Sequence, residues 1–163
     1  MSTKRKTAVK DFDLIVNFTI PGHPATKKNS NRIIWTKVAG RRLPKVIPSK
    51  QYYTYEKSCK PHIASFWKDA PIDYGVLIRI KVWLSAWRIP DHVGILQSLG
   101  DIFQTCKFIK DDKYIQWTDY NFETKEIDQW FAGVDKENPR VEVWVYRYKT
   151  TSEIYETEIK KKK

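Results

Sequence analysis

The chain has 163 residues, a formal net charge of +11, 41% hydrophobic residues and 14% aromatic residues, which fits one folded domain rather than a disordered chain. No apolar run reaches the roughly 18 residues of a membrane span, and the basic N-terminus lacks the apolar stretch of a secretion signal. Because two cysteines are too few for a disulfide framework, we expect a soluble, cytoplasmic protein with no membrane partner.

The N-terminal part of the chain predicts a strand followed by a basic hairpin. Residues 13–20 alternate in hydropathy and are rich in β-forming residues, which is typical of a strand. Two short runs, Arg32–Lys37 and Arg42–Ile47, then flank Ala39-Gly40. This pattern predicts a β-hairpin that carries several cations.

A helix and a strand are expected next. Ser49 is suited to cap a helix that runs to about Lys68, and Pro61 predicts a kink or a break within it. Residues 74–86 contain a long run of β-branched and apolar residues. This run predicts a strand.

The second half predicts a second helix and two more strands. Pro90-Asp91 is a helix-start signal, and apolar residues then recur at helical spacing through Cys106. Residues 114–124 and 141–146 have the composition of strands. We therefore expect an α+β domain with a small mixed β-sheet and two principal helices.

Positive charge is concentrated in the first third of the chain. Residues 1–60 carry fourteen Lys and Arg against three acids, residues 61–159 carry twelve against sixteen, and the last four residues are all Lys. A basic segment attracts a polyanion, and interleaved aromatic rings can stack on exposed bases. A solvated basic surface is the alternative. We expect DNA contacts through Lys27, Lys28, Arg32, Arg41, Arg42 and Lys45.

Four aspartates follow this basic segment. Asp91 opens the second helix, Asp101 lies about three turns further along it, and Asp111 and Asp112 are adjacent in the following turn. Carboxylates brought together in this way can hold Mg²⁺ for phosphodiester hydrolysis. Taken singly, Asp91 can equally be a helix cap, and the adjacent pair can be a turn signal.

Two blocks of the sequence resemble the RusA family of Holliday junction resolvases, which are phage and prophage endonucleases. The first block is residues 19–30, Thr-Ile-Pro-Gly-His-Pro-Ala-Thr-Lys-Lys-Asn-Ser, continued by Pro48–Tyr52. The second block is residues 90–103, Pro-Asp-His-Val-Gly-Ile-Leu-Gln-Ser-Leu-Gly-Asp-Ile-Phe, continued by residues 108–115 with Asp111-Asp112. The resemblance covers about residues 14–146.

The resemblance implies a homodimer that cuts four-way DNA junctions by paired nicks and needs Mg²⁺ or Mn²⁺. By this match Asp91, Asp101 and Asp112 are catalytic, and Asp91, Asp111 and Asp112 bind metal. A two-fold protein also matches a two-fold substrate. No Gly-rich phosphate loop is present in the sequence, so we expect no nucleotide cofactor.

Three positions depart from the family pattern. Val93 stands where the second acid of the Asp-x-Asp element is expected, and Gly94 and Gln97 replace the usual Asn and Lys. A metal ligand and a phosphate-binding cation are thereby lost, although Gln97 lies one turn from Asp101 and can contact DNA. A non-catalytic or weakly active branched-DNA-binding protein is the alternative function. A basic RNA-binding module is a third.

The expected organisation is a single nuclease domain over residues 12–149. A flexible basic segment over 1–11 precedes it, and a flexible Lys-rich tail over 150–163 follows it. Cys59 and His62 are three residues apart on the first expected helix and could form half a zinc site, but no second pair at suitable spacing completes it.

Overall fold

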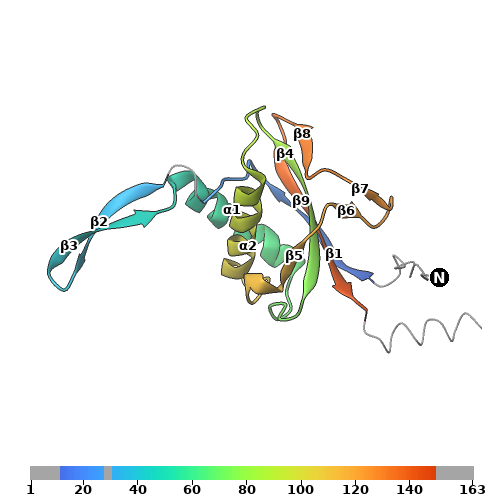
Figure 1. Ribbon diagram of the computed structural model, residues 1–163, viewed down its shortest axis with the longest axis horizontal. Helices are drawn as coiled ribbons and strands as arrows, with labels where there is room; N and C mark the ends of the chain where they lie inside the picture. The colour runs from blue at the N-terminus through green and yellow to red at the C-terminus, as the bar shows by residue number, and fades with distance from the viewer. Residues whose placement is uncertain (1–11, 28–30, 150–163) are drawn as a thin grey trace, which may run out of the picture.

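A mixed β-sheet with two helices on one face forms the body of the molecule (Figure 1). The computed structural model describes residues 12–27 and 31–149, so the expectations for residues 1–11, Lys28 and residues 150–163 lie outside the described residues. The strand order is β1-β9-β4-β5, with β8 pairing with the other end of β4. The strands are β1 (Phe12–Pro21), β4 (Val76–Leu84), β5 (Ile115–Trp117), β8 (Phe131–Val134) and β9 (Arg140–Tyr148).

Strand β4 is the centre of this sheet. It pairs antiparallel with β9 along its length and parallel with β5 and β8 on its other edge. A strand covered on both edges and both faces favours a continuous apolar run over strict alternation, as β4 has. The expected strands over residues 13–20, 74–86 and 141–146 are thus confirmed, and so is the α+β class.

The two helices cover one face of the sheet and bury its main core (Figure 1). Helix α1 (Lys50–Phe66) begins at Ser49, whose side chain accepts a hydrogen bond from the Tyr52 amide. The break considered at Pro61 does not occur. Proline removes only one backbone donor there, and the buried side chains of Cys59 and Ile63 on either side of it keep α1 on the sheet.

Helix α2 (His92–Thr105) begins at Asp91, in agreement with the sequence prediction. Its buried face includes Ile95, Leu99, Ile102 and Phe103, which recur at helical spacing. The exposed side of the helix carries the polar residues Gln97 and Gln104 together with Val93. Among the described residues, no helix is long and apolar enough to cross a membrane.

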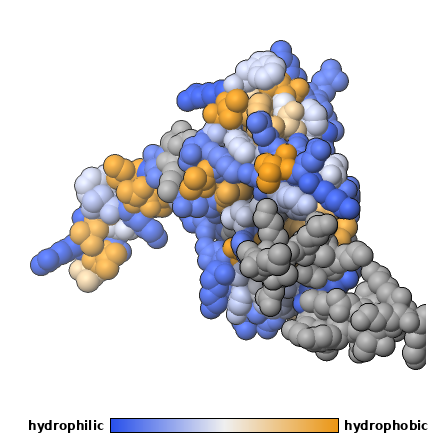
Figure 2. Space-filling model, turned by 45° about the vertical axis from the view of Figure 1, so that its right-hand side comes forward, coloured by the Kyte–Doolittle hydropathy of each residue, from blue (hydrophilic) through white to orange (hydrophobic). Residues whose placement is uncertain are grey.

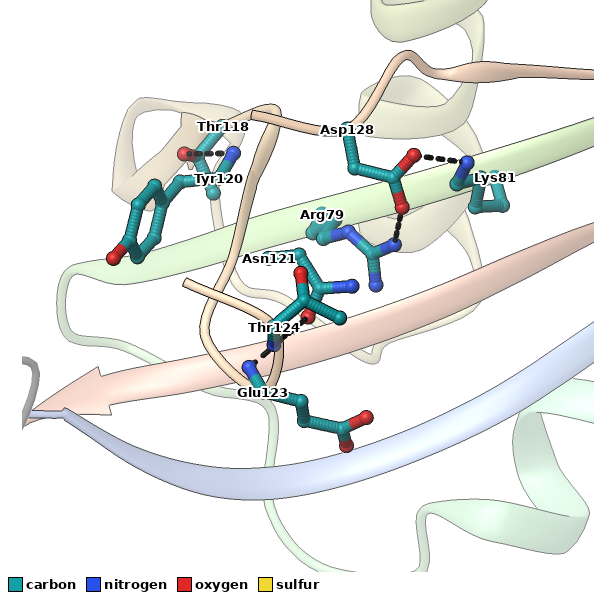
Figure 3. Close-up of polar contacts among 8 residues, drawn as sticks. All are labelled: Arg79, Lys81, Thr118, Tyr120, Asn121, Glu123, Thr124 and Asp128. Atoms are coloured by element: carbon teal, nitrogen blue, oxygen red, sulfur yellow. Dashed lines mark hydrogen bonds and ion pairs between the residues drawn. The ribbon is translucent and has the colours of Figure 1, made fainter. Parts of the chain in front are cut away.

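The other face of the sheet is covered by short segments rather than helices. The predicted strand over residues 114–124 is wrong as a single element, because this stretch divides into three. They are the 3₁₀ turn η2 (Asp112–Tyr114), β5 and β6 (Tyr120–Asn121), and β6 pairs with β7 (Glu126–Ile127). Asn121 ends the run because its side-chain oxygen accepts hydrogen bonds from the two amides that follow in the turn, those of Glu123 and Thr124 (Figure 3).

An ion-pair cluster connects the residue that follows β7 to the sheet. Asp128 accepts hydrogen bonds from Arg79 and Lys81, both on β4 (Figure 3). The Arg79 guanidinium lies 4.3 Å from the Trp144 ring and is almost fully buried. The cluster therefore holds β7 and the residue after it close to β4, the central strand of the sheet.

The basic hairpin forms as predicted and projects away from the body (Figure 1). It consists of β2 (Arg32–Val38) and β3 (Arg41–Ile47), which form a separate two-stranded sheet. Ala39 and Gly40 both have positive φ, at 49° and 79°, which is the two-residue turn that suits the twist of a hairpin. The hairpin ends at Ile47, two residues before Ser49, the residue that caps α1.

Candidate functional site

The polar face of α2 lines a pocket of about 280 Å³. Gln97 and Ser98 lie three and four residues after Gly94, and Asp101 lies four and three residues after them, so the four residues share one side of the helix. Gly94 allows a close approach there, because a Cβ at this position would lie 3.3 Å from Asp91 Oδ2 and 3.4 Å from Thr26 Cγ2. Gly94 therefore allows tight packing of the loop that precedes β2.

Lys27 enters this pocket from that loop. Its backbone N–H donates to Ser98 Oγ at 2.7 Å, and Ser98 is buried. Its ammonium forms an ion pair with Asp101 at 2.8 Å and lies 6.0 Å from the Tyr52 ring. The loop is thus fixed to α2, and a cation stands beside Asp101.

The turn after α2 supplies a second carboxylate. Asp112 lines the same pocket, and its Cβ lies 3.8 Å from the position that a Cβ on Gly100 would take. Asp111, by contrast, is occupied locally. It accepts from the Lys113 amide at 3.0 Å and pairs with the Lys113 ammonium at 3.3 Å, and the backbone hydrogen bond is the main cause that lowers the pKa of Asp111.

Asp91 lies at the edge of the pocket rather than in it. Its Oδ2 accepts from the Gly94 amide at 2.9 Å, so the carboxylate caps α2. It lines a neighbouring groove of about 890 Å³ together with Lys50 and Arg88. His23 lines the same groove, where burial lowers its pKa and Ser85 N–H donates to Nδ1 at 3.2 Å, so this nitrogen is the acceptor.

The structure brings some of the expected site residues together and separates others. Lys27, Gln97, Asp101 and Asp112 share the pocket, whereas Asp91 and Asp111 do not line it. The other expected DNA-binding residues within the described ranges lie on the hairpin: Arg32, Arg41, Arg42 and Lys45. Lys27 brings a cation into the pocket that Gln97 also lines, which the chain order alone does not reveal.

The pocket suits a divalent cation that is shared with a substrate phosphate better than one held by protein alone. In residues 12–27 and 31–149, no group of three or more His, Cys, Asp or Glu side chains is arranged to hold a metal ion. Mg²⁺ usually keeps several waters and takes one or two carboxylates plus substrate phosphates. Asp101 and Asp112 fit that donor set, although a cation there competes with Lys27 for Asp101.

The half zinc site at Cys59 and His62 has no chemical support. Cys59 is completely buried in the core, and burial raises the pKa of its thiol to about 12, so the thiolate that a metal needs is disfavoured.

Val93 is more than half exposed, which leaves the position of the expected second acid facing solvent.

Comparison of the sequence with protein-family models and with curated proteins finds no match. The resemblance to the RusA family therefore stays a prediction that depends on the residues quoted for it.

Proposed function

We propose that the protein is a RusA-like, structure-specific endonuclease that nicks branched DNA with the help of Mg²⁺ or Mn²⁺ and acts as a homodimer. The observation that carries the proposal is the pocket shared by Asp101, Asp112 and Lys27. Two carboxylates and a lysine in one small pocket are the groups that phosphodiester hydrolysis needs. The basic hairpin, which begins five residues after Lys27, supplies the attraction for a polyanion.

In this function Asp101 and Asp112 would hold the cation, and Lys27 would hold the scissile phosphate. When bound, the cation supplies Lewis-acid stabilisation of the negative charge on the phosphate and activates water. Lys27 is suited to release Asp101 when a phosphate arrives, because the ion pair is partly exposed and a phosphate is a competing anion. Gln97 can donate its amide hydrogens to a phosphate oxygen from the same helix face.

The test is cleavage of a labelled four-way junction by the purified full chain in Mg²⁺ or Mn²⁺. We expect paired nicks that are lost in Asp112→Asn and Asp101→Asn, and a decrease of roughly 10²-fold in Lys27→Met, because each removes one group that stabilises transition-state charge. Lys27→Arg retains the cation and should recover part of the rate.

Asp73→Asn is the matched control, because Asp73 is an exposed aspartate outside the pocket. Nicking that persists in both Asp112→Asn and Asp101→Asn would overturn the assignment of this pocket. Sedimentation of the free protein and of the junction complex tests the homodimer separately.

A branched-DNA-binding protein without cleavage is the second candidate. It is favoured by the exposed Val93 at the position of the expected second acid, and by the hydrogen bond that engages Asp91 as a helix cap. This candidate predicts tight junction binding with no nick in either metal. The same cleavage experiment separates the two functions.

A further inference from the structure

The hairpin β2–β3 exposes apolar and basic side chains side by side. Figure 2 shows orange apolar residues next to blue hydrophilic ones along the arm that projects from the body. Three of the apolar side chains are about two-thirds exposed: Ile33 at 67%, Trp35 at 64% and Val46 at 63%. A two-stranded hairpin is marginally stable in water, so apolar side chains this exposed favour a partner that covers them.

The strand register sorts these residues onto two faces. Directly paired residues share a face, and the pairs Ile33–Val46, Trp35–Pro44 and Lys37–Arg42 alternate with the others. One face, here called the Trp35 face, therefore carries an apolar surface towards the base of the hairpin and two cations near its tip. Its members are Ile33, Trp35, Lys37, Arg42, Pro44 and Val46.

Charge decides what kind of partner fits this arm. Residues 32–47 contain five Lys and Arg and no acid, so two copies of the hairpin repel each other. A nucleic acid provides phosphates for these cations and flat apolar base surfaces for the indole. The strands span roughly 24 Å at 3.4 Å per residue, and a two-stranded ribbon of this kind fits a DNA groove.

The base of the hairpin is also close to the candidate site along the chain. Lys27, which lies in the small pocket, precedes β2 by five residues, and Ser49, which lines the larger groove, follows β3 by two. A DNA strand that reaches Asp101 and Asp112 therefore passes near the start of the arm.

We propose that the Trp35 face inserts at the branch point of DNA, where Trp35 stacks on an unstacked base while Lys37 and Arg42 bind the flanking phosphates. This inference rests on the proposed function for its DNA substrate. A branch point exposes base surfaces that the interior of a linear duplex keeps stacked, and apolar wedges of this type hold such steps open. The arm thereby distinguishes branched from linear DNA.

The test measures binding of the full chain in EDTA, so that cleavage does not contribute. The junction carries 2-aminopurine next to the branch position, on the base that loses its stacking partner when the branch base moves onto Trp35, and a linear duplex of the same sequence carries it at the matching position. Wild-type protein should raise the fluorescence of the junction probe. Trp35→Ala should abolish that rise and weaken junction binding roughly 5- to 150-fold, with duplex affinity changed less than about twofold, while Trp35→Phe retains most of both effects.

Leu43→Ala is the matched control, because Leu43 is an exposed apolar residue on the opposite face of the same hairpin. It should leave junction affinity within about twofold. Equal junction affinities for Trp35→Ala and wild type overturn the inference even where the junction is nicked, and nicking then still supports the proposed function. Dissociation of a wild-type dimer by Trp35→Ala, with junction affinity unchanged, also overturns it, since the arm then docks on a second copy of the chain. If Trp35→Ala loses the fluorescence rise and the wild-type protein never nicks the junction, the result supports branch recognition by the Trp35 face and contradicts the proposed nuclease function.

Discussion

At the scale of single residues, Asp128 is the carboxylate on which the second face of the sheet depends. It receives hydrogen bonds from two cations of β4, and Arg79, one of these, is 95% buried. A buried guanidinium that loses its anion keeps its desolvation cost without compensation. The contact thus matters more than an ion pair between two exposed groups.

We predict that Asp128→Asn lowers the free energy of unfolding by about 1–3 kcal/mol at pH 7, because a charge-assisted hydrogen bond is replaced by a weaker one. Asp128 is itself about one-third exposed, so water compensates part of the loss. The hydrogen bond from Lys81 is the main cause that holds the pKa of Asp128 below its usual value, and Arg79 adds to it. Its contribution is therefore present at neutral pH and is lost as pH falls from about 4 through the lower folded value.

Urea unfolding at pH 7, 5 and 3 checks this, with Asp73→Asn as a control at an exposed aspartate. The difference between wild type and Asp128→Asn should shrink as the pH falls. A difference that stays constant from pH 7 to pH 3 would contradict the role of the ionised carboxylate.

The sequence singles out candidate site residues, but it does not predict which of them lie together. Asp101, Asp112, Gln97 and Lys27 were all expected to be functional, and they share one pocket. The ion pair of Lys27 with Asp101 joins residues 74 positions apart, and no local pattern encodes such a contact. For Asp91 the structure displays the helix-capping role that the sequence left open.

At the scale of elements, strong local signals were predictive and weak ones were not. The hairpin, both helices and the three long strands have clear periodicity, turn residues or caps, and all were found. Strands β6, β7 and β8 have two to four residues each and no period to detect. β6 and β7 pair only with each other across a short turn, and β8 forms because it pairs with the distant strand β4.

In the turn of the hairpin, Ala39 adopts a backbone conformation that is unfavourable for alanine. Ala39 has φ 49°, a left-handed conformation that costs a non-glycine residue stability, whereas Asn tolerates it better. We predict that Ala39→Asn stabilises the hairpin and raises amide hydrogen-exchange protection in β2 and β3 about two- to fivefold. Gly40→Ala, at φ 79° in open space, should lower this protection through strain alone.

Amide exchange measured by NMR checks both variants, with the amides of β4 as an internal reference for the body. A change in β4 that equals the change in the hairpin would contradict a local effect.

At the scale of the whole molecule, charge is divided between an arm and a body. The arm carries five cations without an acid, and the acids from Asp111 to Glu142 lie in the sheet and in the turns next to its strands. Long-range attraction therefore acts on one end of the molecule and orients it toward a polyanion.

We predict that the double variant Lys37→Gln/Arg42→Gln reduces the slope of log affinity against log salt by about 2, because each phosphate contact contributes about 0.9. The measurement is the Kd for a four-way junction across a range of NaCl concentrations. The control removes two cations from the body, Lys125→Gln/Lys136→Gln, and should leave the slope unchanged. Equal changes for the two double variants would contradict binding through the arm.

The pairing of β1 with β9 sets the order in which this chain can fold. β1 ends at Pro21 and its partner begins at Arg140, so 118 residues separate the two strands along the chain. At about 5–20 residues per second, a ribosome needs roughly 6 to 24 s to bridge that interval. During this interval Phe18 and Ile20 of β1 lack β9, the strand with which β1 pairs. The sheet is therefore completed only after β9 has been synthesised, and until then the nascent chain carries an open apolar edge.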